Sequence, residues 1–258
     1  MTNLADIMSS FAADADELLI EAPGAWSQGR TQYGGMTAAL CYEAAIRLSG
    51  QAAPLRSAQL TFAGPASGRL RLRPEILRAG KSATIVVVDC TAEKGPAARA
   101  AFAFGSDRES RIAQAAPARP PTPAPEDCPV FMEGGGGFHE QFETRLAQGS
   151  HLFSGSAATF SVWVRFRDRQ DVDATTALLA LADSLPPAAM TLFPEPAPIS
   201  TMTWSIDFAK QPASADGWHL LRSTSEHSGN GYALQAMSLW DAGGDLVASG
   251  RQAVAIFA

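Results

Sequence analysis

The feature that most limits the fold of this 258-residue chain is an order of elements that occurs twice. An apolar helical segment, MTAALCYEAAIRL, precedes strand-like segments that end at ARAAFAF. A second one, ATTALLALADSL, precedes strand-like segments that end at GRQAVAIF. A period this long is not that of a solenoid, so it indicates two copies of one α+β module. Two fused copies can diverge, with one carrying the chemistry and the other supporting it.

The two copies are separated by a segment rich in proline and alanine, AQAAPARPPTPAPEDCP. It shows no apolar period, which is typical of a semi-extended connector. We therefore expect an N-terminal module at residues 1–115, a linker at 116–127 and a C-terminal module at 128–258.

Apolar periodicity predicts helices over residues 4–20, 35–48 and 174–185. The second and third are apolar around most of their circumference, which is typical of buried helices. Alternating segments such as RLRLRPEILRAG and ATFSVWVRF predict half-buried antiparallel strands. Each module should therefore be a long buried helix wrapped by an antiparallel sheet, and pairing of the modules should join the sheets into one platform that covers their edges.

Composition narrows the environment and the partners. No apolar run approaches the ~18–20 residues that span a bilayer, and the acidic N-terminus lacks the basic region of a signal peptide. Three scattered cysteines suit a reducing compartment, so we expect a cytoplasmic protein without a disulfide framework. A net charge of −6 without a basic stripe argues against nucleic acid as a partner.

The common catalytic motifs are absent from the sequence. It contains no GxSxG elbow, no Walker loop and no GxGxxG fingerprint. The four histidines show no metal-ligand spacing, and GGGG at 134–137 is read as a flexible loop. No metal or prosthetic group is therefore expected.

Three polar residues interrupt apolar frames and are the candidate site residues. Asp183 comes late in the apolar segment LLALADSLPP, where a carboxylate costs free energy unless it is hydrogen-bonded. Ser205 lies on the strand face opposite Trp204 and Ile206, and Gln252 interrupts the last apolar strand. Each also has a structural explanation: a solvent-facing helix end, a tolerated strand hydroxyl and a sheet-edge amide.

Seven segments occur in the order found in one known family: QYGGMTAAL, PLRSAQLTFAGP, ILRAGKS, LLALADSLPP, SIDF, DGWHLLRSTS and DLVASGRQ. In this ordered set the chain resembles the type II acyl-CoA thioesterases, which have a double hot-dog fold. The resemblance implies a catalytic Asp late in the second long helix, a Thr or Ser two residues before the strand Asp, and a Gln on the last strand. These roles fall on Asp183, Ser205 and Gln252, and the family more often has Thr at the second position.

The implied activity is hydrolysis of an acyl-CoA thioester, a reaction of fatty acid metabolism, by a water that Asp183, Ser205 and Gln252 hold. By fold analogy, Tyr33, Gly34 and Gly35 border the substrate. Two alternatives stay open: a non-catalytic acyl-CoA-binding hot-dog protein, and a hot-dog hydratase or dehydratase. The latter usually needs an Asp–His pair, and no His is near Asp183 in sequence. Acyl chain length, CoA against acyl-carrier protein, and assembly into a homo-oligomer are left open.

Overall fold

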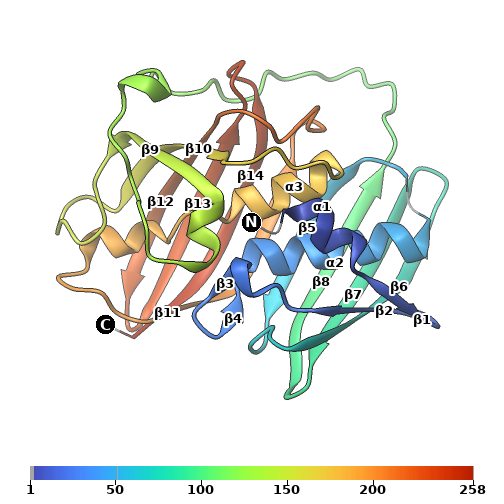
Figure 1. Ribbon diagram of the computed structural model, residues 1–258. Coiled ribbons are helices and arrows are strands. Elements are labelled where there is room, and N and C mark those ends of the chain that lie inside the picture. Colours follow the sequence, from blue (N-terminus) through green and yellow to red (C-terminus); the bar gives the residue numbers. More distant parts are fainter. Residues whose placement is uncertain (1–2, 51, 258) are drawn as a thin grey trace.

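The computed structural model describes residues 3–50 and 52–257, and it contains a 12-stranded antiparallel sheet with two helices against one face (Figure 1). The strand order is β1-β2-β6-β7-β8-β5-β11-β14-β13-β12-β10-β9. The first half comprises α1 (Leu4–Ser9), β1 (Ala12–Asp14), β2 (Glu17–Glu21), the 3₁₀ turn η1 (Gly24–Trp26), β3 (Ser27–Gln28), β4 (Thr31–Gln32), α2 (Gly34–Ser49), β5 (Leu55–Phe62), β6 (Arg69–Ala79), β7 (Ala83–Ala92) and β8 (Gly95–Gly105).

The second half repeats this plan with a shorter helix. It comprises the 3₁₀ turns η2 (Pro125–Asp127) and η3 (Gly137–Gln141), β9 (Phe142–Gly149), β10 (Thr159–Phe166), α3 (Ala174–Ala182), η4 (Ala188–Leu192), β11 (Ile199–Phe208), β12 (His219–Gly229), β13 (Tyr232–Trp240) and β14 (Leu246–Ile256). Strands β5 and β11 pair, with Gln59 opposite Ser205, and so join the halves. The predicted continuous sheet is confirmed. No helix within the described residues is long and apolar enough to cross a membrane.

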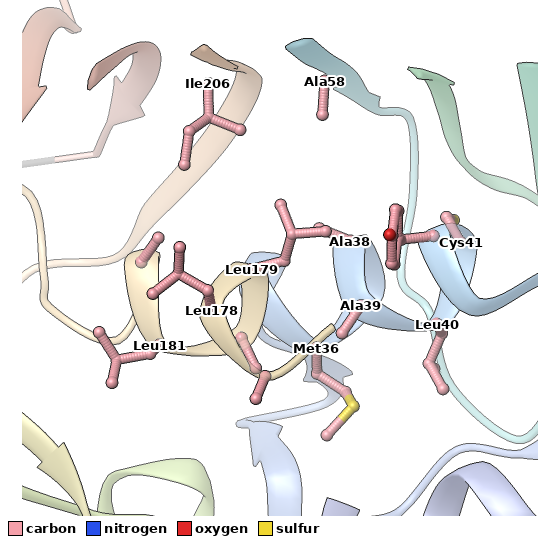
Figure 2. Packing of buried hydrophobic residues seen from close by; sticks show 14 of the residues in the cluster. Met36, Ala38, Ala39, Leu40, Cys41, Ala58, Leu178, Leu179, Leu181 and Ile206 are labelled. Carbon is pink, nitrogen blue, oxygen red and sulfur yellow. The ribbon is translucent and has the colours of Figure 1, made fainter. Parts of the chain in front are cut away.

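Helices α2 and α3 form the centre of the core. Leu40, Ala44, Leu178 and Leu181 are each at most 1% exposed, as their apolar circumference predicts. Figure 2 shows Leu179 on the side of the helices that faces Ile206 and Ala58 of the sheet, whereas Leu40 and Leu181 point to the opposite side, and all five belong to one apolar cluster. Contacts at both ends show that the helices run antiparallel: the start of α2 meets the end of α3, and Glu43 of α2 meets Thr176 of α3. The end of one helix therefore lies beside the start of the other.

The prediction of one helix over residues 4–20 is wrong. Helix α1 ends at Ser9, and the chain then forms the hairpin β1–β2 around Ala15, which has φ of 54°. Strand β2 pairs with β6, with Leu18 opposite Leu72. Pairing at the sheet edge buries Leu18 and Ile20 and overrides the local helical pattern.

The Pro-rich connector lies against the second half. Between Gly105 and Pro125 it contains no helix or strand, and it crosses the top of the molecule in Figure 1. Two buried indoles hold it: Trp240 Nε1 donates to Pro117 O at 3.1 Å, and Trp163 Nε1 donates to Pro123 O at 2.9 Å. The Arg119 guanidinium lies 5.0 Å from the centre of the Trp163 ring.

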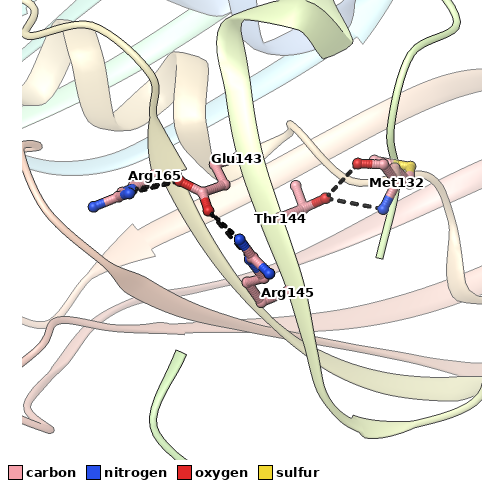
Figure 3. A network of polar contacts seen from close by, with 5 residues as sticks. All are labelled: Met132, Glu143, Thr144, Arg145 and Arg165. Atoms are coloured by element: carbon pink, nitrogen blue, oxygen red, sulfur yellow. Dashed lines mark hydrogen bonds and ion pairs between the residues drawn. The ribbon is translucent and has the colours of Figure 1, made fainter. Parts of the chain in front are cut away.

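Polar contacts attach the segment around Met132, which follows the Pro-rich connector, to strand β9 (Figure 3). Thr144 Oγ1 accepts a hydrogen bond from Met132 N at 3.1 Å and donates one to Met132 O at 3.2 Å. Glu143 accepts from Arg145 and Arg165. Burial raises the pKa of Glu143, but the two guanidiniums outweigh it and hold that pKa below its usual value. The two Thr144 hydrogen bonds fix the backbone of Met132, which lines the cavity described below.

Candidate active site

A cavity of about 580 Å³ lies where the two halves meet. Its lining comes from the start of α2, the residues that follow α3, the start of β11, strand β14 and the segment around η3. Its polar lining includes Thr37, His139, Asp183, Thr201 and Gln252, and its apolar lining includes Phe62, Met132, Phe138, Leu152, Leu185 and Met190. A few polar groups in a mostly apolar concavity are typical of a small-molecule site.

Asp183 follows the last residue of α3. The helix ends at Ala182, earlier than the predicted end at 185, and Pro186 and Pro187 prevent its continuation. Position at a helix C-terminus is unfavourable for a carboxylate, but the antiparallel packing also places Asp183 at the N-terminus of α2. There the backbone N–H of Gly35 donates to it. The positive end of α2 therefore compensates for the end of α3.

Two glycines allow this close approach. A Cβ atom at Gly34 would lie 2.5 Å from Asp183 Oδ2, and one at Gly35 would lie 2.6 Å from Ala180 O. A side chain at either position would collide with α3 or with the carboxylate. The sequence QYGG is therefore what brings the first turn of α2 against Asp183.

The pKa of Asp183 is raised from its usual value of 3.8 to about 7. Burial is the largest cause, and the hydrogen bonds from Gln252 and Gly35 act in the opposite direction. A carboxylate with a pKa near neutrality is a far stronger proton acceptor than an exposed one and is still largely ionised at slightly alkaline pH. This is the property that a general base needs.

Gln252 connects Asp183 to a buried chain of amides. Gln252 Nε2 donates to Asp183 Oδ1 at 2.5 Å. Its Oε1 accepts from Gln235 Nε2 at 3.1 Å, and Gln235 Oε1 accepts from Ala188 N at 2.6 Å. Gln235 is absent from the sequence prediction, although its place in the alternation Ala233, Gln235, Met237 puts it on the core face of β13.

Ser205 lies on the sheet face opposite to the one from which Gln252 donates to Asp183. Trp204 pairs with Gln252 and is buried, whereas Ser205 pairs with Arg251 and points to the other face of the sheet. There it borders a second hollow, of about 460 Å³, with Gln59 and Arg99, and Gln252 lies in the lining of both hollows. No contact between Ser205 and Asp183 is seen among the described residues, and a shared water stays a prediction.

Two hydroxyl residues of β11, Ser200 and Thr201, line the cavity of Asp183, and Thr201 is the more buried of the two. The register of β11 against β14 shifts between Thr201 and Thr203, so Met202 is an extra residue in the strand. The bulge reverses the alternation and places Thr201 on the same face as Trp204. Without it, Thr201 would share the outer face of Ser205.

Of the residues expected at the substrate, Gly34 lines the cavity and Gly35 donates to Asp183. Tyr33 is 2% exposed and is not among the residues that line the cavity. Its hydroxyl donates to Ala180 O at 2.9 Å, and its ring stacks on Phe138 at 4.1 Å between centroids. Burial, followed by the nearby Asp183 charge, holds the pKa of Tyr33 well above its usual value. Tyr33 therefore supports the turn as a neutral phenol.

His139 is a cavity residue that sequence proximity does not reveal. It follows GGGG, 44 positions before Asp183, and the fold brings both to one cavity. Burial lowers the pKa of His139, and no hydrogen bond joins it to Asp183 among the described residues. The same part of the chain contains no group of three His, Cys, Asp or Glu side chains that could hold a metal.

One sheet wrapped around two antiparallel helices defines a double hot-dog protein, as predicted. The profile of the acyl-CoA thioesterase N-terminal domain matches residues 22–105, and that of the C-terminal domain matches residues 113–256. The chain belongs to the acyl-CoA thioesterase family. Comparison with curated proteins finds no match.

Solved structures share this fold over nearly the whole chain. A conserved protein of unknown function with a hot dog fold from Alicyclobacillus acidocaldarius has a TM-score of 0.89 at 23% identity, covering 100% of this chain and 99% of the other. An acyl-CoA thioesterase II, TesB2, from Mycobacterium marinum has a TM-score of 0.80 at 20% identity, covering 97% of each chain. The tesB protein of Mycobacterium avium subs paratuberculosis has a TM-score of 0.81 at 16% identity, covering 98% and 99%.

Proposed function

We propose that this protein hydrolyses acyl-CoA thioesters with Asp183 as the general base. The observation that carries the proposal is a carboxylate with a pKa of about 7 inside a mostly apolar cavity, held between an amide N–H and a helix N-terminus. The family supplies the substrate class.

We also propose that the chain consists of an N-terminal module at residues 1–115 and a C-terminal module at residues 128–258, and that the protein is located in the cytoplasm.

In the proposed reaction, ionised Asp183 accepts a proton from a water as the water oxygen bonds to the thioester carbonyl carbon. The carbonyl oxygen becomes an oxyanion, which the first turn of α2 stabilises with backbone N–H groups. The intermediate collapses, the C–S bond breaks, and the leaving sulfur takes the proton from Asp183. The products are the free acid and CoA, and the carboxylate is restored.

Gln252 and Thr201 complete the proposed site. The Gln252 amide donates to Asp183 Oδ1 and the Gly35 N–H donates to the same carboxylate, whose remaining lone pairs can accept from water. Thr201 offers a hydroxyl that both donates and accepts, so it can orient that water. Thr201 thereby takes the role that the resemblance implied for Ser205.

The test is release of thiol from a panel of acyl-CoAs, followed with a thiol reagent, beside water addition to an enoyl-CoA. We expect thiol release and no hydration. Hydration without thiol release would favour a hydratase that uses Asp183 and His139, which share the cavity. Binding of acyl-CoA with neither reaction would favour a non-catalytic binding protein.

A further inference from the structure

The amide of Gln252 can act on Asp183 in only one of its two orientations. With Nε2 toward Asp183 Oδ1, as observed, it donates to the carboxylate. Rotated by half a turn, its Oε1 would face an ionised carboxylate with no proton between them. Side-chain amides are nearly symmetric in shape, so packing alone does not select an orientation.

The ionised carboxylate favours the observed orientation, and Gln235 enforces it whether Asp183 is ionised or protonated. Gln235 lies directly opposite Gln252 in the β13–β14 register, and the two side chains are 2% and 5% exposed. Its NH2 group donates to Gln252 Oε1 at 3.1 Å. A rotated Gln252 would present its own NH2 to this donor and leave both groups unpaired in the interior, which is costly.

The orientation of Gln235 is in turn fixed by a backbone group. Ala188 N–H, the first of η4, donates to Gln235 Oε1 at 2.6 Å. A backbone N–H can only donate, so Gln235 must present its oxygen to Ala188 and its NH2 to Gln252. The Ala188 N–H thus fixes the orientation of the Gln235 amide, and Gln235 fixes that of the Gln252 amide, which donates to Asp183.

We propose that Gln235 is a positioning residue for the reaction: it holds the Gln252 amide with its N–H toward Asp183. The inference rests on the proposed function for its kinetic consequences, whereas its effect on the ionisation of Asp183 is independent of turnover. Gln235 itself is not among the cavity-lining residues, so its substitution should change kcat and leave KM within about twofold.

The test begins with Gln235→Met, which keeps length and apolar packing but has no donor. We expect kcat to fall roughly ten- to hundredfold, the range for losing one hydrogen bond to a charged group. The pKa of Asp183, followed by ¹³C NMR and assigned with Asp183→Asn, should rise because its charged form has lost a fixed donor. Gln170→Met is the matched control, since Gln170 is also buried and accepts from a backbone N–H, that of Leu4. It should leave both quantities unchanged.

A double-mutant cycle shows whether Gln235 acts through Gln252. In a Gln252→Met background, Gln235→Met should produce no further change in kcat or in the pKa of Asp183. Equal effects in both backgrounds, or no effect in the wild-type background, would overturn the inference. If Gln235→Met does not fold, Gln235→Glu takes its place: it keeps the acceptor for Ala188, and its ionised form draws the Gln252 NH2 away from Asp183. Unchanged kcat and unchanged Asp183 pKa in that variant would equally overturn it.

The two proposals fail in different ways. A wild-type protein that releases no thiol from any acyl-CoA would remove the proposed function, yet the NMR titration would still report on the amide orientation. If the wild type releases thiol and the pKa of Asp183 is unchanged in Gln235→Met, only the positioning role of Gln235 is refuted.

Discussion

Asp183 is held at a cost to the folded state. An ionised carboxylate at this site has lost most of its water and gains two hydrogen bonds in return, from Gln252 and Gly35. Its raised pKa shows that these bonds do not fully compensate for burial. The same environment makes it a useful proton acceptor, so reactivity and instability have one cause.

This cost predicts that Asp183→Asn stabilises the protein at neutral and alkaline pH. The pKa of Asp183 in the folded state, about 7, lies above its unfolded value of 3.8. The contribution of Asp183 to the free energy of unfolding is therefore most favourable below pH 3.8 and is lost as pH rises through about 7. From about 1.4 kcal/mol per pH unit, less an allowance for water in the cavity, we expect a gain of roughly 2–4 kcal/mol at pH 8 and none near pH 3. Urea unfolding at both values measures it, and a gain equal at the two would contradict the assignment.

Two of the hydroxyl residues of β11, Thr201 and Ser205, make opposite predictions. Thr201→Val should reduce kcat by up to roughly tenfold, the effect of losing one hydrogen bond of about 0.5–1.5 kcal/mol, because it removes a cavity hydroxyl without changing shape. Ser205→Ala, on the outer face, should leave kcat unchanged. Steady-state thiol release from one acyl-CoA compares them, and a larger loss in Ser205→Ala would reverse the assignment.

At the scale of elements, apolar periodicity was sufficient for α2, α3 and most strands, because packing of their apolar faces determines them. It failed for residues 10–20, where a long-range pair with β6 decides. It also could not reveal the bulge at Met202, because a register shift depends on the neighbouring strand. The alternation around Trp204 and Ile206 did indicate that Ser205 faces away from the core. The role predicted for Ser205 came from the family resemblance and not from this alternation.

The contact between α2 and Asp183 depends on Gly34. Gly34→Ala would place a methyl group 2.5 Å from Asp183 Oδ2, so the carboxylate must move. A displacement near 1 Å in a catalytic group costs about 10² in rate, and we expect a loss of that order in kcat. Gly24→Ala is the control, since nothing lies within 4 Å of its added Cβ. Thiol release by the two variants decides, and equal activity would refute the close contact.

On the scale of the whole molecule, the two halves have diverged at equivalent positions. Glu43 lies nine residues after the first residue of α2, as Asp183 does for α3. Glu43 is bonded to Arg47 at 2.6 Å and to Thr176 Oγ1 at 3.0 Å, and the Arg47 guanidinium lies over Phe11. The carboxylate of the first half thus has a cation as its partner, whereas that of the second half has an amide and a helix N-terminus and opens to the cavity.

The shared sheet and core predict that the halves unfold together. Strands β5 and β11 are paired, and one apolar cluster includes residues from both helices and both halves of the sheet. Scanning calorimetry should give one transition with equal calorimetric and van't Hoff enthalpies. Two resolved transitions would show that the halves are separate folding units.

The most direct test of the central claim is kcat for thiol release by Asp183→Asn. Asparagine matches the carboxylate in size and keeps one acceptor oxygen for the neighbouring N–H groups, but it cannot take a proton from water. We expect a fold retained by circular dichroism and a kcat lowered by about 10²–10⁴, the usual contribution of a general base. A kcat within a fewfold of the wild type would contradict it.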